Sequence, residues 1–207
     1  MCDGHSYCDD QSDEKYCPRI VFEKNHNKNF PPKTKGWDIS DVTPTVVETK
    51  ISILNVMTVD QEEHQLDLIA KIEFNWLDPR LSYPFLKNNS YENDINKTTS
   101  DQIWIPNYEL LFLEDFTQII YKLIIVKNGV PTMLGGSEAL HPLETYDGAE
   151  NSLHMEIIFR GKFLCHFANM GNYPFAHDNC NFTIYLIENR VASLKLVKLG
   201  QSCKPRR

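Results

Sequence analysis

Residues 165–180 read CHFANMGNYPFAHDNC, so two cysteines, Cys165 and Cys180, frame a loop of 14 residues. The tip of this loop is Tyr173-Pro174-Phe175. A disulfide that closes a loop of this length would contribute about 3 kcal/mol by restricting the unfolded chain. It would also hold an apolar aromatic–proline–aromatic tip in a fixed shape at the surface. Since an exposed apolar patch marks a contact surface, the loop predicts a partner for its tip.

The chain before this loop contains runs with the period of two that is typical of β-strands. Apolar residues alternate with mostly polar ones through 66–76 (LDLIAKIEFNW) and again through 153–163 (LHMEIIFRGKF). A third run, 117–126 (TQIIYKLIIV), is followed by Asn128-Gly129, which is a strong hairpin signal. No helix of useful length is expected. Many strands at this spacing predict an all-β sandwich or barrel.

The length and the charge of the chain narrow its function. The 207 residues are enough for one sizeable β domain with a small appendage. The formal net charge of −7 argues against a nucleic-acid partner, because phosphate binding needs clustered Lys and Arg. No HExxH metal motif, Gly-rich phosphate loop or G-x-S-x-G elbow occurs. We therefore expect no enzymatic activity and no catalytic residue.

Cysteines and glycosylation motifs indicate an oxidising, extracellular setting. Six cysteines are present, three of them within the first 17 residues. Three Asn-X-Ser/Thr sequons occur, at Asn88, Asn96 and Asn181. No apolar stretch reaches the ~18 residues that a membrane-spanning helix requires.

The first residues are acidic and rich in cysteine. Residues 2–17 read CDGHSYCDDQSDEKYC, and such a segment folds only around disulfides or a hard cation. The spacing resembles the C-terminal half of a low-density-lipoprotein-receptor class A module. This resemblance implies a disulfide between Cys2 and Cys17 and calcium ligation by Asp3, Asp13 and Glu14; we expect no other cofactor. Residues 1–17 are thus expected to form a partial module, and 18–44, which contain four prolines and no periodicity, a linker.

Three features in order resemble one family over roughly residues 37–200. They are Trp76-Leu77-Asp78-Pro79-Arg80-Leu81 after an alternating strand, Trp104-Ile105-Pro106-Asn107, and the loop from Cys165 to Cys180. Together they resemble the extracellular ligand-binding domain of Cys-loop receptors, the pentameric ligand-gated ion channels. The resemblance implies a twisted immunoglobulin-like sandwich over 45–207 that is incomplete at its C-terminus. It also implies five copies around an axis, an agonist bound between neighbours, and a membrane domain beyond this chain.

The same resemblance assigns a coupling role to two loops. The turn that contains Val59, Asp60, Gln61 and Glu62 would press on the membrane domain together with Tyr173, Pro174 and Phe175, and so link ligand binding to channel opening. The loop differs from the family pattern in two ways. It has 14 residues between its cysteines where the family has 13, and Ala176 follows Phe175 where the family has an aspartate.

The ligand site implied by the family has few aromatic residues here. The positions that carry ligand-binding rings in amine receptors fall on Lys71, Leu111 and Ile187, while Tyr108 and Tyr185 lie near enough in sequence to substitute. A ring would attract a cation, whereas Lys71 suits an acidic ligand or a carboxylate of a neighbouring subunit. We take as ligand-site candidates Lys71, Glu73, Tyr108, Leu111, Tyr185 and Ile187.

Two alternatives remain open from the sequence. One is a secreted, soluble ligand-binding protein that is built on the same sandwich and has no pore. The other is an unrelated adhesion or lectin-like β-sandwich.

Overall fold

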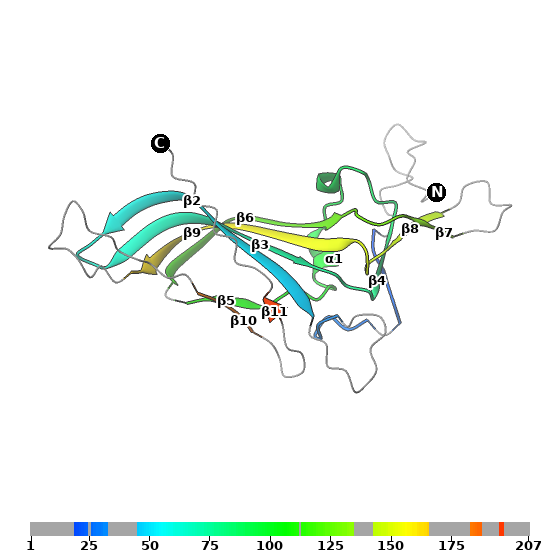
Figure 1. Ribbon diagram of the computed structural model, residues 1–207, viewed down its shortest axis with the longest axis horizontal. Coiled ribbons are helices and arrows are strands. Elements are labelled where there is room, and N and C mark those ends of the chain that lie inside the picture. Colours follow the sequence, from blue (N-terminus) through cyan, green and yellow to red (C-terminus); the bar gives the residue numbers. More distant parts are fainter. Residues whose placement is uncertain are drawn as a thin grey trace.

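The computed structural model describes residues 19–24, 26–32, 45–111, 113–134, 143–165, 183–187 and 195–196. In this part of the chain strands dominate, which confirms the all-β prediction (Figure 1). The strands are β1 (Val21–Phe22), β2 (Val46–Asp60), β3 (Gln65–Trp76), β4 (Leu81–Pro84), β5 (Tyr108–Leu110), β6 (Leu113–Val126), β7 (Thr132–Leu134), β8 (Leu143–Asp147), β9 (Ser152–Leu164), β10 (Ile184–Leu186) and β11 (Lys195–Leu196). Helical structure there is confined to the 3-10 turn η1 (Ser90–Glu92) and the single turn α1 (Lys97–Ser100), and no helix of the described residues could cross a membrane.

One long twisted sheet forms the first layer, with the strand order β11-β2-β3-β9-β6. The central strand β3 pairs antiparallel with β2 on one side and with β9 on the other along its whole length, from Gln65 to Trp76. The turn predicted after residue 59 is present, since β2 and β3 form a hairpin through residues 61–64.

The second layer consists of two smaller sheets, with the orders β1-β4-β8-β7 and β10-β5. Figure 1 shows β5 and β10 below the long sheet, and β4, β7 and β8 toward one of its ends. The apolar face of the long sheet is buried against these elements, which makes the fold a β-sandwich, as the sequence predicts.

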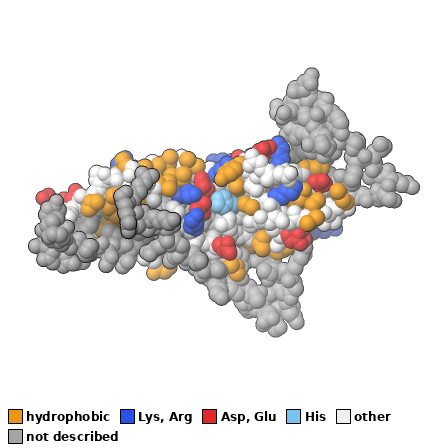
Figure 2. Space-filling view, turned by 45° about the horizontal axis from the view of Figure 1, so that its top comes forward, with side chains coloured by type: hydrophobic (Ala, Val, Ile, Leu, Met, Phe, Trp, Pro, Cys, Tyr) orange, Lys and Arg blue, Asp and Glu red, His pale blue; other side chains and the backbone are white. Residues whose placement is uncertain are grey.

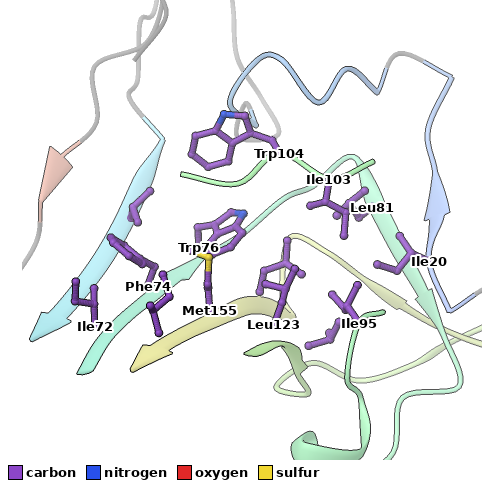
Figure 3. Packing of buried hydrophobic residues seen from close by; sticks show 14 of the residues in the cluster. Ile20, Ile72, Phe74, Trp76, Leu81, Ile95, Ile103, Trp104, Leu123 and Met155 are labelled. Atoms are coloured by element: carbon purple, nitrogen blue, oxygen red, sulfur yellow. The ribbon is translucent and has the colours of Figure 1, made fainter. Parts of the chain in front are cut away.

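The core is built from the even-numbered residues of β3 and the odd-numbered residues of β9. Because side chains alternate across a strand, Phe74, Trp76 and Met155 all point inward and are buried. Figure 3 shows Trp76 beside Met155, with Trp104 next to it. The two tryptophan rings meet edge to face, with their centroids 6.1 Å apart. Both tryptophans of the sequence motifs are therefore core residues, as large aromatic side chains on alternating faces commonly are.

A buried ion pair forms the corner that follows β3. Asp78 is 0% exposed, and the guanidinium of Arg80 donates to both of its carboxylate oxygens, at 2.8 and 2.7 Å. The same guanidinium donates to the backbone carbonyls of Asn27 and Phe30, each at 3.0 Å. The Asp78 carboxylate thus has hydrogen-bond donors although it is buried, and the segment at residues 27–30 is held at the corner. The Asp-Pro-Arg spacing places the guanidinium where it can make both sets of bonds.

A glycine closes the same corner. The backbone N–H of Gly148 donates to the carbonyl of Leu81 at 2.9 Å. A Cβ atom at this position would lie 2.2 Å from the carbonyl oxygen of Asp78, so that only glycine fits without moving the backbone.

The predicted linker over residues 18–44 is wrong for the part of it that is described. β1 pairs with β4 in the second layer, and Ile20 is buried in the core cluster. Lys28 and His26 also bind backbone carbonyls of the loop at 101–102. The sequence suggested a linker because this segment contacts the sandwich only through a strand of two residues and through scattered side chains. Such contacts leave no periodic pattern in the sequence.

The hairpin predicted at Asn128-Gly129 is also wrong. β6 pairs with β9, whereas β7 pairs with β8 in the other layer, so the chain crosses between sheets at this point. The backbone N–H groups of Asn128 and Gly129 instead donate to the side-chain oxygen of Asn151, each at 3.0 Å. An asparagine that lies far away in sequence therefore takes the hydrogen bonds that a hairpin partner would have taken.

The corner yields a stability prediction. Replacing Arg80 by Ala leaves the Asp78 carboxylate buried without its partner, and we expect a loss of about 3 kcal/mol in the free energy of unfolding. The matched control is Lys162→Ala, which removes an exposed pair with Asp115 and should cost less than about 1 kcal/mol. Urea unfolding of the three proteins measures both values, and equal losses would contradict the role assigned to the corner.

Candidate functional site

On β3 and β9, the face of the long sheet that points away from the core carries mostly polar side chains. Since the even-numbered residues of β3 face inward, Lys71, Glu73 and Asn75 face outward, next to His154 and Glu156 on β9. We call these five residues the outward cluster. Two of them, Lys71 and Glu73, are ligand-site candidates from the sequence, and the structure places them on one face, two residues apart.

The charges of the outward cluster are paired with one another. The ammonium of Lys71 lies 3.0 Å from Glu73 Oε1 and 3.5 Å from Glu156 Oε2, and Lys50 on β2 lies 3.4 Å from Glu73 Oε2. That last contact is a long ion pair, and Glu73 Oε2 accepts no close hydrogen bond from the described residues. The pairs follow from the register, because Glu73 stands opposite Lys50 on one side and Glu156 on the other.

These contacts shift the pKa values of the cluster. Burial raises the pKa of Glu73, but the hydrogen bond from Lys71 and the charges of Lys71 and Lys50 outweigh it and bring the pKa below its usual range. Burial lowers the pKa of Lys71, but the hydrogen bonds and charges of Glu73 and Glu156 outweigh this effect. The net result is a pKa above its usual value, so the ammonium stays charged. The Lys71 charge is thus already compensated within its own chain.

His154 lies at the end of the same cluster. Its Nδ1 is 2.7 Å from Asn75 Oδ1. Burial lowers the pKa of His154, against the opposing effect of the Glu73 and Glu156 carboxylates. One ligand atom each from Glu73, His154 and Glu156 lies within 4.8 Å of the others, which makes this the one potential metal-binding group found among the described residues.

A further ion pair lies on this face, closer to the β2–β3 hairpin. Arg160 Nε donates to Asp67 Oδ1 at 3.0 Å, and its Nη2 donates to Oδ2. The hydrogen bonds from Arg160 hold the pKa of Asp67 below its usual value, although burial opposes the shift.

A second set of candidates lies on the small β5–β10 sheet. Tyr108, Tyr185 and Ile187 come together there with Leu111, because β10 pairs with β5 and Ile187 N–H donates to the Asn107 carbonyl at 2.7 Å. The ring of Tyr108 packs against Phe74, with 5.2 Å between the centroids, so this tyrosine supports the core. Tyr185, in contrast, is 53% exposed. Of these two tyrosines, Tyr185 is the ring available to a ligand.

Sequence reasoning missed the residue beside Tyr185. The register places Glu109 directly opposite Tyr185, and Glu109 is exposed. Side chains directly opposite across antiparallel strands lie close together, so an aromatic ring and a carboxylate stand side by side on this surface. No local sequence signal joins them, because they are 76 positions apart (185 minus 109).

The predicted coupling turn is organised by its own side chains. Asp60 Oδ1 accepts from the backbone N–H groups of Glu62 and Glu63, each at 3.0 Å, and His64 ends the turn in the left-handed region with φ 54°. The backbone N–H of Cys165 donates to the His64 carbonyl at 2.8 Å. The structure therefore brings the turn at Val59–Glu62 to the first residue of the cysteine-framed loop.

The other predicted site residues are only partly described. Asn88 and Asn96 are exposed; Asn88 Oδ1 accepts from Lys127, and Asn96 caps α1 through its Oδ1. Cys165 is buried at the end of β9, and its pairing with Cys180 stays a prediction. The remaining predicted positions lie outside the described residues, namely Cys2, Asp3, Asp13, Glu14, Cys17, Tyr173, Pro174, Phe175, Cys180 and Asn181.

A protein-family comparison agrees with this geometry. Residues 19–128, slightly more than half of the chain, match the model of the neurotransmitter-gated ion-channel ligand binding domain. The chain belongs to this family. Among curated proteins none matches it. The matched region begins at residue 19 and so includes β1, in agreement with the packing of that segment on the sandwich.

Membership has two direct consequences. The family consists of receptors without enzymatic activity, which confirms the prediction that this chain is not an enzyme. The domain of this family is the extracellular part of membrane channels and binds their ligands. The matched region contains the β2–β3 turn, β5 and the outward residues of β3.

The Asp67–Arg160 pair predicts a pH dependence of stability. Because the folded-state pKa of Asp67 lies below its ordinary value of 3.8, the pair contributes stability above that value and loses it as the pH falls through the lowered pKa. We expect Asp67→Asn to be less stable than the wild type at about pH 6, with a smaller difference at about pH 3. Urea unfolding at both pH values measures this, and a difference that grows in acid would contradict it.

Proposed function

We propose that this chain is the ligand-binding domain of one subunit of a pentameric ligand-gated ion channel, with the ligand held between neighbouring subunits. The observation that carries the proposal, beyond family membership, is that the candidate residues fall on two separate surfaces. Tyr185 and Glu109 lie on the small sheet, and the outward cluster lies on the far face of the long sheet. Two different surfaces on one chain are what a heterologous, ring-closing interface requires.

The chemistry of the small sheet favours a cationic ligand. A cation over a tyrosine ring is attracted by about 0.5–2 kcal/mol, depending on how much water is removed. The Glu109 carboxylate opposite Tyr185 adds a charge of the right sign. We therefore propose a small ligand that carries an amino group.

The alternative suggested by Lys71, an acidic ligand, is less favoured. The Lys71 ammonium is already shared between Glu73 and Glu156. A ligand carboxylate would compete with both of them, so Lys71 is better suited to shaping the outward face than to binding an anion.

We propose that ligand binding is coupled to the channel through the end of the long sheet that carries the β2–β3 turn. The β2–β3 turn is hydrogen-bonded to Cys165, so a shift of the long sheet would move the turn and the start of the loop together. We propose that Val59, Asp60, Gln61 and Glu62 act on the membrane domain with the Tyr173–Phe175 tip. We also propose an extracellular location for this chain. It would then carry a disulfide between Cys165 and Cys180, a calcium-binding segment at residues 1–17, and glycans on Asn88, Asn96 and Asn181.

The test is current recording from oocytes that express the complete subunit containing this chain, with a screen of small amines. For an amine that opens the channel, Tyr185→Ala should raise the half-maximal concentration by about tenfold, and Tyr185→Phe should restore most of the response because the ring is kept. Glu109→Gln should weaken the response in the same direction.

The control is Tyr91→Ala, which removes an exposed tyrosine that packs against Lys122 and should leave the response unchanged. An unchanged response in Tyr185→Ala would remove Tyr185 from the site. If the complete protein binds the amine, contains no membrane-spanning segment and carries no current, the soluble binding protein is the correct alternative.

A further inference from the structure

We propose that Glu73, His154 and Glu156 form a binding site for a divalent transition-metal ion, with zinc as the best fit, on the outward face of the long sheet. The three side chains project from the two neighbouring strands β3 and β9, and their ligand atoms all lie within 4.8 Å of one another. These three residues lie on a different sheet from Tyr185 and Glu109, on the face that the proposed function assigns to the neighbouring-subunit contact.

The sheet register gives these side chains a fixed geometry. Glu73 and Glu156 stand directly opposite each other, and His154 follows Glu156 on the same face, opposite Asn75. Zinc ligands lie about 2.0–2.2 Å from the metal, so neighbouring ligand atoms in a tetrahedral site are about 3.4 Å apart. Since the ligand atoms already lie within 4.8 Å of one another, the proposal requires only that the side chains rotate until these atoms reach this separation.

The donor set distinguishes the kind of metal. One imidazole nitrogen and two carboxylate oxygens, with a fourth position open to water or another ligand, match the ligands that zinc accepts. Calcium and magnesium prefer sites made of oxygen alone. The proposed selectivity is therefore for zinc and similar transition metals over the alkaline-earth ions.

The contact of His154 with Asn75 orients the imidazole ring for a metal. With Nδ1–H donating to Asn75 Oδ1 over 2.7 Å, the other ring nitrogen keeps a lone pair for a metal. A histidine that binds a metal characteristically donates its other N–H in this way, which fixes both the tautomer and the ring orientation.

Lys71 is the internal competitor of the metal. Its ammonium lies 3.0 Å from Glu73 and 3.5 Å from Glu156, so in the metal-free protein it neutralises the charge of both carboxylates. A bound metal ion has to replace it there. Lys50 also faces Glu73, whereas Lys122, opposite Glu156, has its ammonium 4.6 Å from the centroid of the Tyr91 ring. The proposal therefore requires that removal of Lys71 strengthens metal binding.

The face is open to ions from solution. Glu73, His154 and Glu156 are each partly exposed. Figure 2 shows side chains of both charges and a histidine gathered near the middle of the long axis of the molecule. An ion can therefore reach the cluster without any opening of the sandwich.

The experiment measures zinc affinity of the whole chain by competition with a chromophoric chelator, and cobalt binding by its visible absorption. His154→Gln and Glu156→Gln should each weaken zinc binding at this site by at least about tenfold, and Asn75→Ala by about tenfold because it removes the group that orients His154. Lys71→Met should bind zinc more tightly than the wild type. Calcium and magnesium in large excess should not compete.

Two controls separate the site from other metal-binding groups and from misfolding. His26→Ala removes a histidine whose Nε2 contacts the Gln102 carbonyl and which is not one of the three proposed ligands, and it should leave the affinity unchanged. Each variant must keep the circular dichroism spectrum of the wild type, and Lys71→Gln replaces Lys71→Met if the latter does not. The proposal is overturned if zinc affinity in His154→Gln equals that of the wild type, or if removal of the Lys71 charge leaves it unchanged or weaker.

Discussion

The register of β3 between its two neighbours is the constraint on which the rest of the structure depends. Twelve residues from Gln65 to Trp76 pair with β2 on one side and β9 on the other. Because side chains alternate strictly, this register decides at once which residues form the core and which face outward. A slip by one residue would expose Phe74 and Trp76 and bury Glu73 and Lys71, each change costing several kcal/mol.

The corner after β3 stabilises the position of the second layer. Asp78 and Arg80 pair in a buried site, and the guanidinium also binds carbonyls of a segment about 50 residues earlier. Gly148 permits the β8 end to approach the same corner closely. One short motif thus connects β1, β4 and β8 to the strand that organises the long sheet, and the family match that begins at residue 19 includes all but the last of these elements.

The outward cluster is a candidate site that forms only because β3 and β9 pair side by side. Lys71 and Glu73 were candidates from the sequence, Lys71 because the family resemblance pointed to its position. His154 and Glu156 were missed, since each looked like the polar member of an alternating strand, and nothing local shows that β9 lies next to β3. For the same reason Glu109 was not associated with Tyr185, whereas Tyr108 looked like a ligand ring although it packs against Phe74.

What the sequence determined by itself was the strand periodicity, the inward side of β3 and β9, the turn after Val59, and the family through its Trp, Asp-Pro-Arg and cysteine motifs. These are local properties, because side-chain alternation and turn chemistry act over a few residues. Only the tertiary structure decided that residues 19–32 pack on the sandwich, that Asn128-Gly129 crosses between sheets, and that Glu73, His154 and Glu156 converge. Each of these depends on hydrogen-bond pairing between segments that are distant in sequence, and a strand's own residues do not specify which partner satisfies its backbone groups.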